Sequence, residues 1–171
     1  MKGDEIMNYS FTGDLEGLSD GLQILSNEID FNIKKDGFPV EVINRAGNIE
    51  IEVNKNKAVI KYEQKIHFFR ALGLLIETMN KKDTFNLTEK PQFDLNGVMF
   101  DCSRNAVLKV SSLKKIIRMM SLMGLNMIML YTEDTYEIED EPYFGYLRGR
   151  YSYDELKECD DYAQKLGIEM I

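Results

Sequence analysis

Apolar residues spaced three and four positions apart predict two helices in the first ninety residues. One apolar face consists of Leu15, Leu18, Leu22, Leu25 and Ile29. The second pattern runs from Ile66 to Met79 as a broad apolar stripe with charged residues off it. Because Gly17 and Gly21 interrupt the first pattern and glycine weakens a helix interior, the second is the stronger pattern. We expect the second helix to pack across a sheet.

Between the two predicted helices, apolar and polar residues alternate, as in strands with one buried face. The alternating segments contain Val40 and Val42, then residues 49–53, then residues 58–62, with turn residues such as Gly47-Asn48 between them. This pattern predicts an antiparallel meander. Residues 1–90 are therefore predicted to form an α+β domain, an antiparallel sheet with packed helices, with a short further strand near Phe85.

After a polar connector, with a domain boundary predicted near Pro91, the pattern changes to alternating strands and helices. Strands are predicted at Gly97–Phe100, at the apolar run 126–131 and at 168–171. Ser111 is predicted to cap a helix that ends at Gly124, and Ser152 with Glu155 forms the capping box of a helix over 156–166. This order is typical of a parallel sheet covered by helices, either open or a (β/α)8 barrel.

Composition narrows the functional classes. The 171 residues include 21 Lys+Arg and 29 Asp+Glu, a net charge of −8, and 44% are hydrophobic. A folded globular protein is predicted, while the acidic surface argues against nucleic-acid and anionic-membrane partners.

The two cysteines, Cys102 and Cys159, are expected to be free thiols, and the single His67 argues against a histidine metal centre. We expect no cofactor and no metal. No residue run resembles a signal peptide or a membrane span, which predicts a cytoplasmic protein. The residues after Phe100 lack the glycine-rich turn that a dinucleotide site needs.

One segment resembles a known family. Gly97-Val-Met-Phe-Asp101-Cys-Ser-Arg104-Asn105 resembles the first barrel strand of the family-20 glycoside hydrolases, the β-N-acetylhexosaminidases. The resemblance continues through segments 123–127, 131–134 and 142–151, and more weakly through 68–72 in the upstream domain. The subgroup most similar is that of intracellular-type exo-β-N-acetylglucosaminidases. The resemblance implies that residues 91–171 begin a TIM-barrel catalytic domain.

The length of that segment leads to a further expectation. A (β/α)8 barrel needs about 250 residues, whereas 97–171 supplies 75. In the family, the catalytic acid belongs to an Asp-Glu pair after the fourth strand, which would lie beyond Ile171. The chain is therefore expected to be an N-terminal fragment that is inactive alone and holds no catalytic residue. The parent enzyme would hydrolyse terminal β-linked N-acetylhexosamine by substrate-assisted retaining catalysis. Its expected partners are N-acetylhexosaminide glycans, bound by the complete barrel, and the fragment is open to self-association through its sheet edge.

Four residues are predicted to bind substrate. By resemblance, Arg104 donates hydrogen bonds to the O3 and O4 hydroxyls of the non-reducing sugar, a task suited to its rigid fork of N–H donors. Asp101 is expected to support Arg104. Glu133 and Asp134 follow the second strand of this segment and either line the pocket rim or pair with arginines of the next loop. Asp154-Glu155 is interpreted as a helix start rather than a catalytic pair.

Other interpretations remain open at this level. The aromatic loop residues Tyr143, Phe144, Tyr146, Tyr151 and Tyr153 suit a lid or subsite wall, or a cover for the barrel flank. The rival function is a non-catalytic carbohydrate-binding or interaction domain, although the unpaired apolar strand edges argue against a free-standing protein. A barrel enzyme of another glycosidase class is a third possibility.

Overall fold

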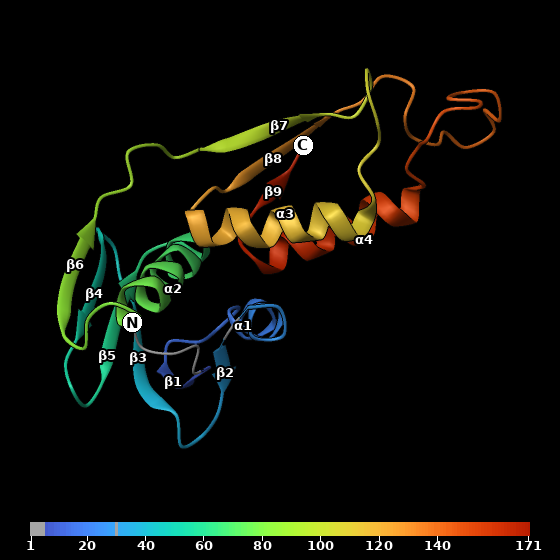
Figure 1. Ribbon diagram of the computed structural model, residues 1–171. Coiled ribbons are helices and arrows are strands. Elements are labelled where there is room, and N and C mark those ends of the chain that lie inside the picture. The colour runs from blue at the N-terminus through green and yellow to red at the C-terminus, as the bar shows by residue number, and fades with distance from the viewer. Residues whose placement is uncertain (1–5, 30) are drawn as a thin grey trace. The chain divides into compact units, whose positions relative to one another are not determined.

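The computed structural model describes residues 6–29 and 31–171, which form two compact units (Figure 1). The first unit runs to Asp94 and takes in Leu122–Gly124, and the second contains the rest of the chain from Leu95.

The first unit is built on a six-stranded sheet with strand order β2-β1-β3-β5-β4-β6. The strands are β1 (Met7–Gly13), β2 (Phe31–Ile33), β3 (Phe38–Asn44), β4 (Ile49–Val53), β5 (Ala58–Tyr62) and β6 (Phe85–Glu89). Two helices accompany them, α1 (Ser19–Ser26) and α2 (Lys65–Met79). The predicted second helix and the strand near Phe85 are confirmed, whereas β1 and β2 were not predicted.

The sheet is mixed, so the predicted antiparallel sheet is wrong. The β4–β5 hairpin is antiparallel, and its turn is held by Asn54 Oδ1, which accepts the backbone N–H groups of Asn56 and Lys57 at 2.8 and 3.0 Å. However, β3 pairs with β5 in parallel, and β1 pairs in parallel with both β2 and β3. The chain leaves β3, forms β4 one place further out and returns as β5 between them. Alternation identifies strands but does not specify which edges pair.

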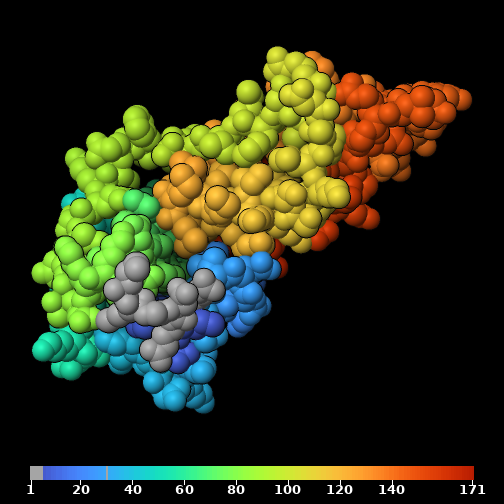
Figure 2. Space-filling model, in the orientation of Figure 1, coloured from blue at the N-terminus to red at the C-terminus, as the bar shows by residue number. Residues whose placement is uncertain are grey.

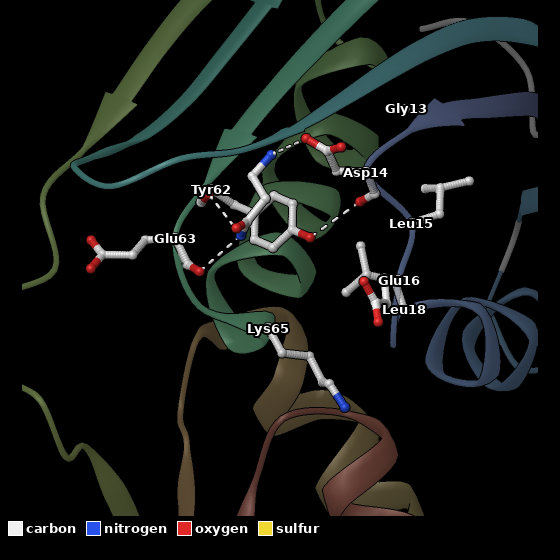
Figure 3. A pocket seen from close by; sticks show the side chains of 9 residues that line it. Gly13, Asp14, Leu15, Glu16, Leu18, Tyr62, Glu63 and Lys65 are labelled. Atoms are coloured by element: carbon white, nitrogen blue, oxygen red, sulfur yellow. Dashed lines mark hydrogen bonds between the residues drawn. The ribbon is translucent and has the colours of Figure 1, made fainter.

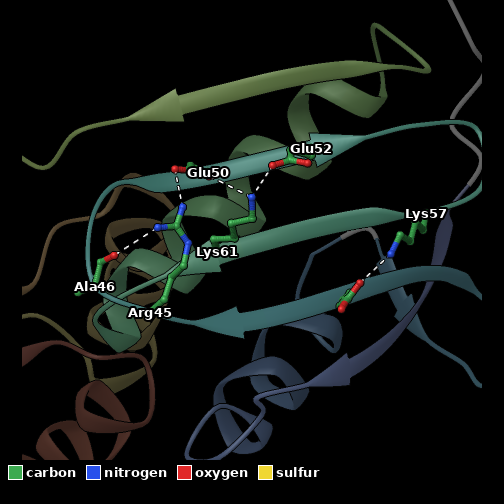
Figure 4. A network of polar contacts seen from close by, with 7 residues as sticks. Arg45, Ala46, Glu50, Glu52, Lys57 and Lys61 are labelled. Atoms are coloured by element: carbon green, nitrogen blue, oxygen red, sulfur yellow. Dashed lines mark hydrogen bonds and ion pairs between the residues drawn. The ribbon is translucent and has the colours of Figure 1, made fainter.

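One face of this sheet forms the core and the other is polar. Ile51 and Ile60 are fully buried on the α2 side, where Phe68 of α2 packs edge-on against Tyr62 with ring centroids 5.6 Å apart. On the other face, Lys61 pairs with Glu50 at 3.2 Å within a network of charged side chains (Figure 4). The sheet is therefore amphipathic, with α2 packed on its apolar face.

Helix α1 is shorter than the predicted pattern. It begins at Ser19, because Gly17 has a φ of +70°, which lies outside the helical region. Leu22 and Leu25 are buried as predicted, but Leu15 and Ile29 fall outside the helix.

The second unit is a parallel sheet with two helices. Its strands β7 (Gly97–Asp101), β8 (Met127–Tyr131) and β9 (Glu169–Met170) lie in that order, and its helices are α3 (Val110–Met123) and α4 (Tyr153–Lys165). The predicted parallel pairing is confirmed. The capping box is also confirmed, since Glu155 N donates to Ser152 Oγ at 3.2 Å and Ser152 N donates to Glu155 Oε2 at 2.9 Å. The predicted cap at Ser111 is wrong, because α3 begins at Val110 and Ser111 lies in its first turn.

A glycine at the start of β7 sets how closely the strands of the second unit approach. A Cβ on Gly97 would lie 1.9 Å from the Met127 carbonyl oxygen, so Gly97→Ala must displace backbone. We expect a loss of about 1–3 kcal/mol in unfolding free energy. The measurement is hydrogen exchange of the β8 amides. Gly149→Ala is the matched control, because its Cβ would meet Val107 at an ordinary 3.8 Å. Equal exchange in the two variants would contradict the argument.

The single histidine provides a pH test of the first unit. Gln64 N donates to His67 Nδ1 at 3.2 Å, and burial lowers the pKa of His67 below its ordinary 6.5, which the charges of Glu63 and Glu89 only partly oppose. Because the folded pKa lies below 6.5, the buried neutral ring contributes to the stability of the first unit above pH 6.5. This contribution is lost as the pH falls through the folded pKa. A proton NMR titration of the native chain should place the His67 pKa below 6.5. A value at or above 6.5 would contradict the dominance of burial over the charges of Glu63 and Glu89.

Candidate functional site

The turn after β7 is organised by the Asp101 carboxylate. Its Oδ1 accepts the backbone N–H groups of Ser103 and Arg104 at 3.0 and 3.1 Å, and its Oδ2 accepts Arg104 Nε at 2.5 Å. The backbone hydrogen bond from Arg104 is the main cause that lowers the pKa of Asp101. The expected contact between Asp101 and Arg104 is therefore present, and it holds the first and last residues of the turn together.

Besides Asp101, the Arg104 guanidinium contacts Tyr131 at the end of β8. Residues 101 and 131 are paired in the sheet, and the Arg104 guanidinium lies over the Tyr131 ring, 5.5 Å from its centroid. The Arg104 side chain is 68% exposed, and only its Nε is bound to Asp101. The two terminal nitrogens therefore remain for an external acceptor, such as a pair of neighbouring hydroxyls.

Glu133 is tied to the same turn. Its carboxylate accepts hydrogen bonds from the Ser103 hydroxyl and, at 3.3 Å, from the Tyr131 hydroxyl. Ser103 is buried, so this contact links the ends of β7 and β8. Of the two interpretations for the acidic pair, pairing with a loop arginine holds for Asp134, which lies 3.1 Å from Arg148. A role in lining a pocket rim stays a prediction for both acids.

Arg148 connects the loop between β8 and α4 to this site, and Arg150 makes a contact within the loop. Arg148 donates through Nη2 to the Ser103 carbonyl oxygen, and Arg150 donates to the Phe144 carbonyl oxygen. Tyr143 and Tyr146 are 81% and 64% exposed, whereas Tyr151 is buried in the core of the unit. In the space-filling view this orange loop projects from the second unit (Figure 2). The aromatic residues thus divide between core packing and exposed surface.

Cysteine chemistry plays no part in this arrangement. Cys102 and Cys159 are buried free thiols, and burial raises the pKa of Cys159. Burial, with Cys102 nearby, also raises the pKa of the Tyr151 phenol. The raised pKa values keep the Cys159 thiol and the Tyr151 phenol neutral.

Among residues 6–29 and 31–171, no group of three or more histidine, cysteine or acidic residues is placed to hold a metal ion. Over the same described part of the chain, none of the helices combines the length and the apolar character needed to cross a bilayer.

Sequence reasoning named Arg104, Asp101, Glu133 and Asp134, and the first three lie around one turn. It assigned no role to Tyr131 or Ser103, which connect them. The only sequence signal for Tyr131 was its position at the end of a predicted strand. Its contact with Arg104 depends on the pairing register of β7 and β8.

Comparisons with known proteins give a likeness of fold. No protein-family model matches the chain, and neither does any curated protein. A family-20 exo-β-N-acetylglucosaminidase from Vibrio harveyi, solved with N-acetylglucosamine, superposes with a TM-score of 0.75 at 18% identity, over 98% of this chain and 32% of that one. The β-N-acetylhexosaminidases from Streptomyces coelicolor and Bacteroides fragilis give TM-scores of 0.73 and 0.74 at 16% and 17% identity.

The superposed regions take in 96% of this chain in both of these cases, and 41% and 40% of the two enzymes. The chain therefore spans about a third to two fifths of the enzymes it matches. At these identities the likeness shows a shared fold.

The Asp101 turn makes a testable pH prediction. A carboxyl group with a lowered folded pKa stabilises its turn above its ordinary pKa of 3.8 and loses that contribution as the pH falls through the folded value. The backbone amide signals of Ser103 and Arg104 should therefore titrate together, with a midpoint below 3.8, in an NMR pH series. The titration should vanish in Asp101→Asn. Midpoints at or above 3.8 would mean that the carboxylate is not bound as described.

Proposed function

We propose that this chain is the N-terminal part of an exo-β-N-acetylhexosaminidase, and that its second unit begins the (β/α)8 catalytic barrel. The observation that carries the proposal is the superposition of nearly the whole chain on such enzymes, with the Arg104 turn at the carboxyl end of a parallel strand. That end of the strands is where barrel enzymes build their active sites. The first unit is then the small domain that precedes the barrel.

In this proposal Arg104 binds the O3 and O4 hydroxyls of the terminal N-acetylhexosamine. Two adjacent hydroxyls suit the two terminal nitrogens of a guanidinium, and Asp101 restricts the rotation of the side chain by holding Nε at 2.5 Å. The Tyr131 ring also lies against the guanidinium, 5.5 Å from its centroid to Cζ. Pre-ordering of this kind lowers the entropy cost of binding. Glu133 and Asp134 would line the rim of the same pocket.

Hydrolysis in the parent enzyme would be substrate-assisted. The 2-acetamido group of the sugar would attack the anomeric carbon, while an Asp-Glu pair orients that group and protonates the leaving oxygen. That pair follows the fourth barrel strand in the family, and the second unit of this chain contains β7, β8 and β9. We therefore expect the 171-residue chain to bind sugar weakly and not to hydrolyse it. The intracellular-type exo-β-N-acetylglucosaminidases remain the proposed subgroup, in the cytoplasm.

The test is an NMR titration of the 171-residue chain with N-acetylglucosamine. We expect a dissociation constant of about millimolar magnitude, with shifts at the amides around Arg104. Arg104→Lys keeps the charge but loses the fork, so the affinity should fall about tenfold. Arg45→Lys is the matched control, because Arg45 belongs to the polar sheet face of the first unit.

Two results would contradict the proposal. One is sugar-induced shifts that are unaffected by Arg104→Lys, which would place binding elsewhere. The other is release of p-nitrophenol from its N-acetylglucosaminide by the purified chain, which would require a catalytic acid within these residues.

A further inference from the structure

A crevice in the first unit lies far from Arg104 in the sequence and has no role in the proposed function. Its volume is about 650 Å³, within the usual range of ligand sites (Figure 3). The residues that line it come from three places, the segment after β1, the end of β3 and the junction between β5 and α2. All of them belong to the first unit.

The topology of the mixed sheet explains why a crevice forms here. Strands β1, β3 and β5 are parallel, and they end at Gly13, Asn44 and Tyr62, all of which line the crevice. In the strand order, the chain leaves β1 through α1 towards β2 at one edge of the sheet, and it leaves β3 in the opposite direction, towards β4. Where connections from adjacent parallel strands separate in this way, the carboxyl ends frame a crevice, and open α/β sheets bind their ligands there.

The hydrogen-bond donors of the crevice are largely used internally. Tyr62 donates its hydroxyl to the Asp14 carbonyl oxygen at 3.2 Å. Asn44 donates its side-chain amide to the carbonyl oxygens of Tyr62 and Glu63, at 3.4 and 3.0 Å, and its backbone N–H to Asp14 Oδ2 at 2.9 Å. The donors at the ends of β3 and β5 are thus bound to acceptors of the same unit.

Acceptors and negative charge are in excess. Asp14, Glu16 and Glu63 supply three carboxylates, against one ammonium group from Lys65. The Glu63 carboxylate accepts the N–H of Gly47 at 3.0 Å, and in Figure 3 it points away from the other lining side chains. The exposed loop residues Asp14 and Glu16 remain as the acidic side of the crevice, and with Lys65 they leave an excess of one negative charge. A ligand that complements this crevice must bring donors and positive charge.

We infer that this crevice binds a small organic cation that carries a primary ammonium group and hydroxyls. The ammonium group would lie against the carboxylates of Asp14 and Glu16, with Leu18 as an apolar floor. This inference is independent of the proposed function, because it concerns residues of the first unit only.

The experiment compares two probes that differ in charge. Glucosamine is protonated at about pH 6, since its amine resembles an α-amino group, whereas N-acetylglucosamine is neutral. In an NMR titration of the complete chain, glucosamine should shift the backbone amides of residues 13–18, 44 and 62–65, and N-acetylglucosamine should leave them in place. The shifts should weaken as salt is added, because exposed charges are screened.

Charge variants supply the control. Glu16→Gln should weaken glucosamine binding by about two- to fivefold, and Glu16→Lys by at least about tenfold. Asp36→Asn removes the same charge from the turn before β3, at the opposite end of the strands, and should change nothing.

Each other outcome overturns the inference. Equal shifts from both sugars would mean recognition through hydroxyls alone. Binding unchanged in Glu16→Lys would exclude the acidic side of the crevice, and no shift at about 10 mM glucosamine would exclude the site. N-acetylglucosamine shifts near Arg104 are read separately in the same spectra. Failure of this inference and failure of the proposed function can therefore be told apart.

Discussion

Parallel pairing is the constraint on which both units depend. Two parallel strands cannot be joined by a tight turn, so the chain must cross over between them, and the segments that leave their carboxyl ends gather at one edge of the sheet. In the second unit this edge carries Asp101 and Tyr131 in register. In the first unit it carries Gly13, Asn44 and Tyr62. Polar side chains far apart in the sequence thereby become neighbours without any local motif.

Local sequence signals were sufficient to predict structure where the interacting residues lie within one element or turn. The capping box of Ser152 and Glu155 needs only residues three apart. The run over 126–131 is apolar enough to indicate a strand, although within β8 Ile128 is buried and Tyr131 is exposed. Asp101 and Arg104 are also three apart, so their contact was within reach of sequence reasoning. Strand β1 alternates Met7, Tyr9 and Phe11 with polar residues, so its signal was present although it was not predicted.

Pairing between elements could not be predicted in the same way. The alternation in β3 and β5 is satisfied equally by an antiparallel neighbour and by the parallel one that the structure has. Burial of Val42 and Ile60 on one face requires only the correct phase of each strand, and the direction of pairing does not change that phase. For the same reason the contact of Ser103 with Glu133, thirty positions apart, followed from register rather than from a pattern.

The contacts of Arg148 couple the aromatic loop to the Arg104 turn. Because one guanidinium contacts both the Ser103 carbonyl oxygen and Asp134, the ordered loop and the ordered turn stabilise each other. Thermodynamic linkage makes such coupling reciprocal. A ligand that binds Arg104 only when the turn is formed therefore also favours the loop conformation in which Arg148 contacts Ser103, although it need not touch the loop. In the second unit, ligand binding at Arg104 and ordering of the loop are therefore coupled through the contact of Arg148 with Ser103.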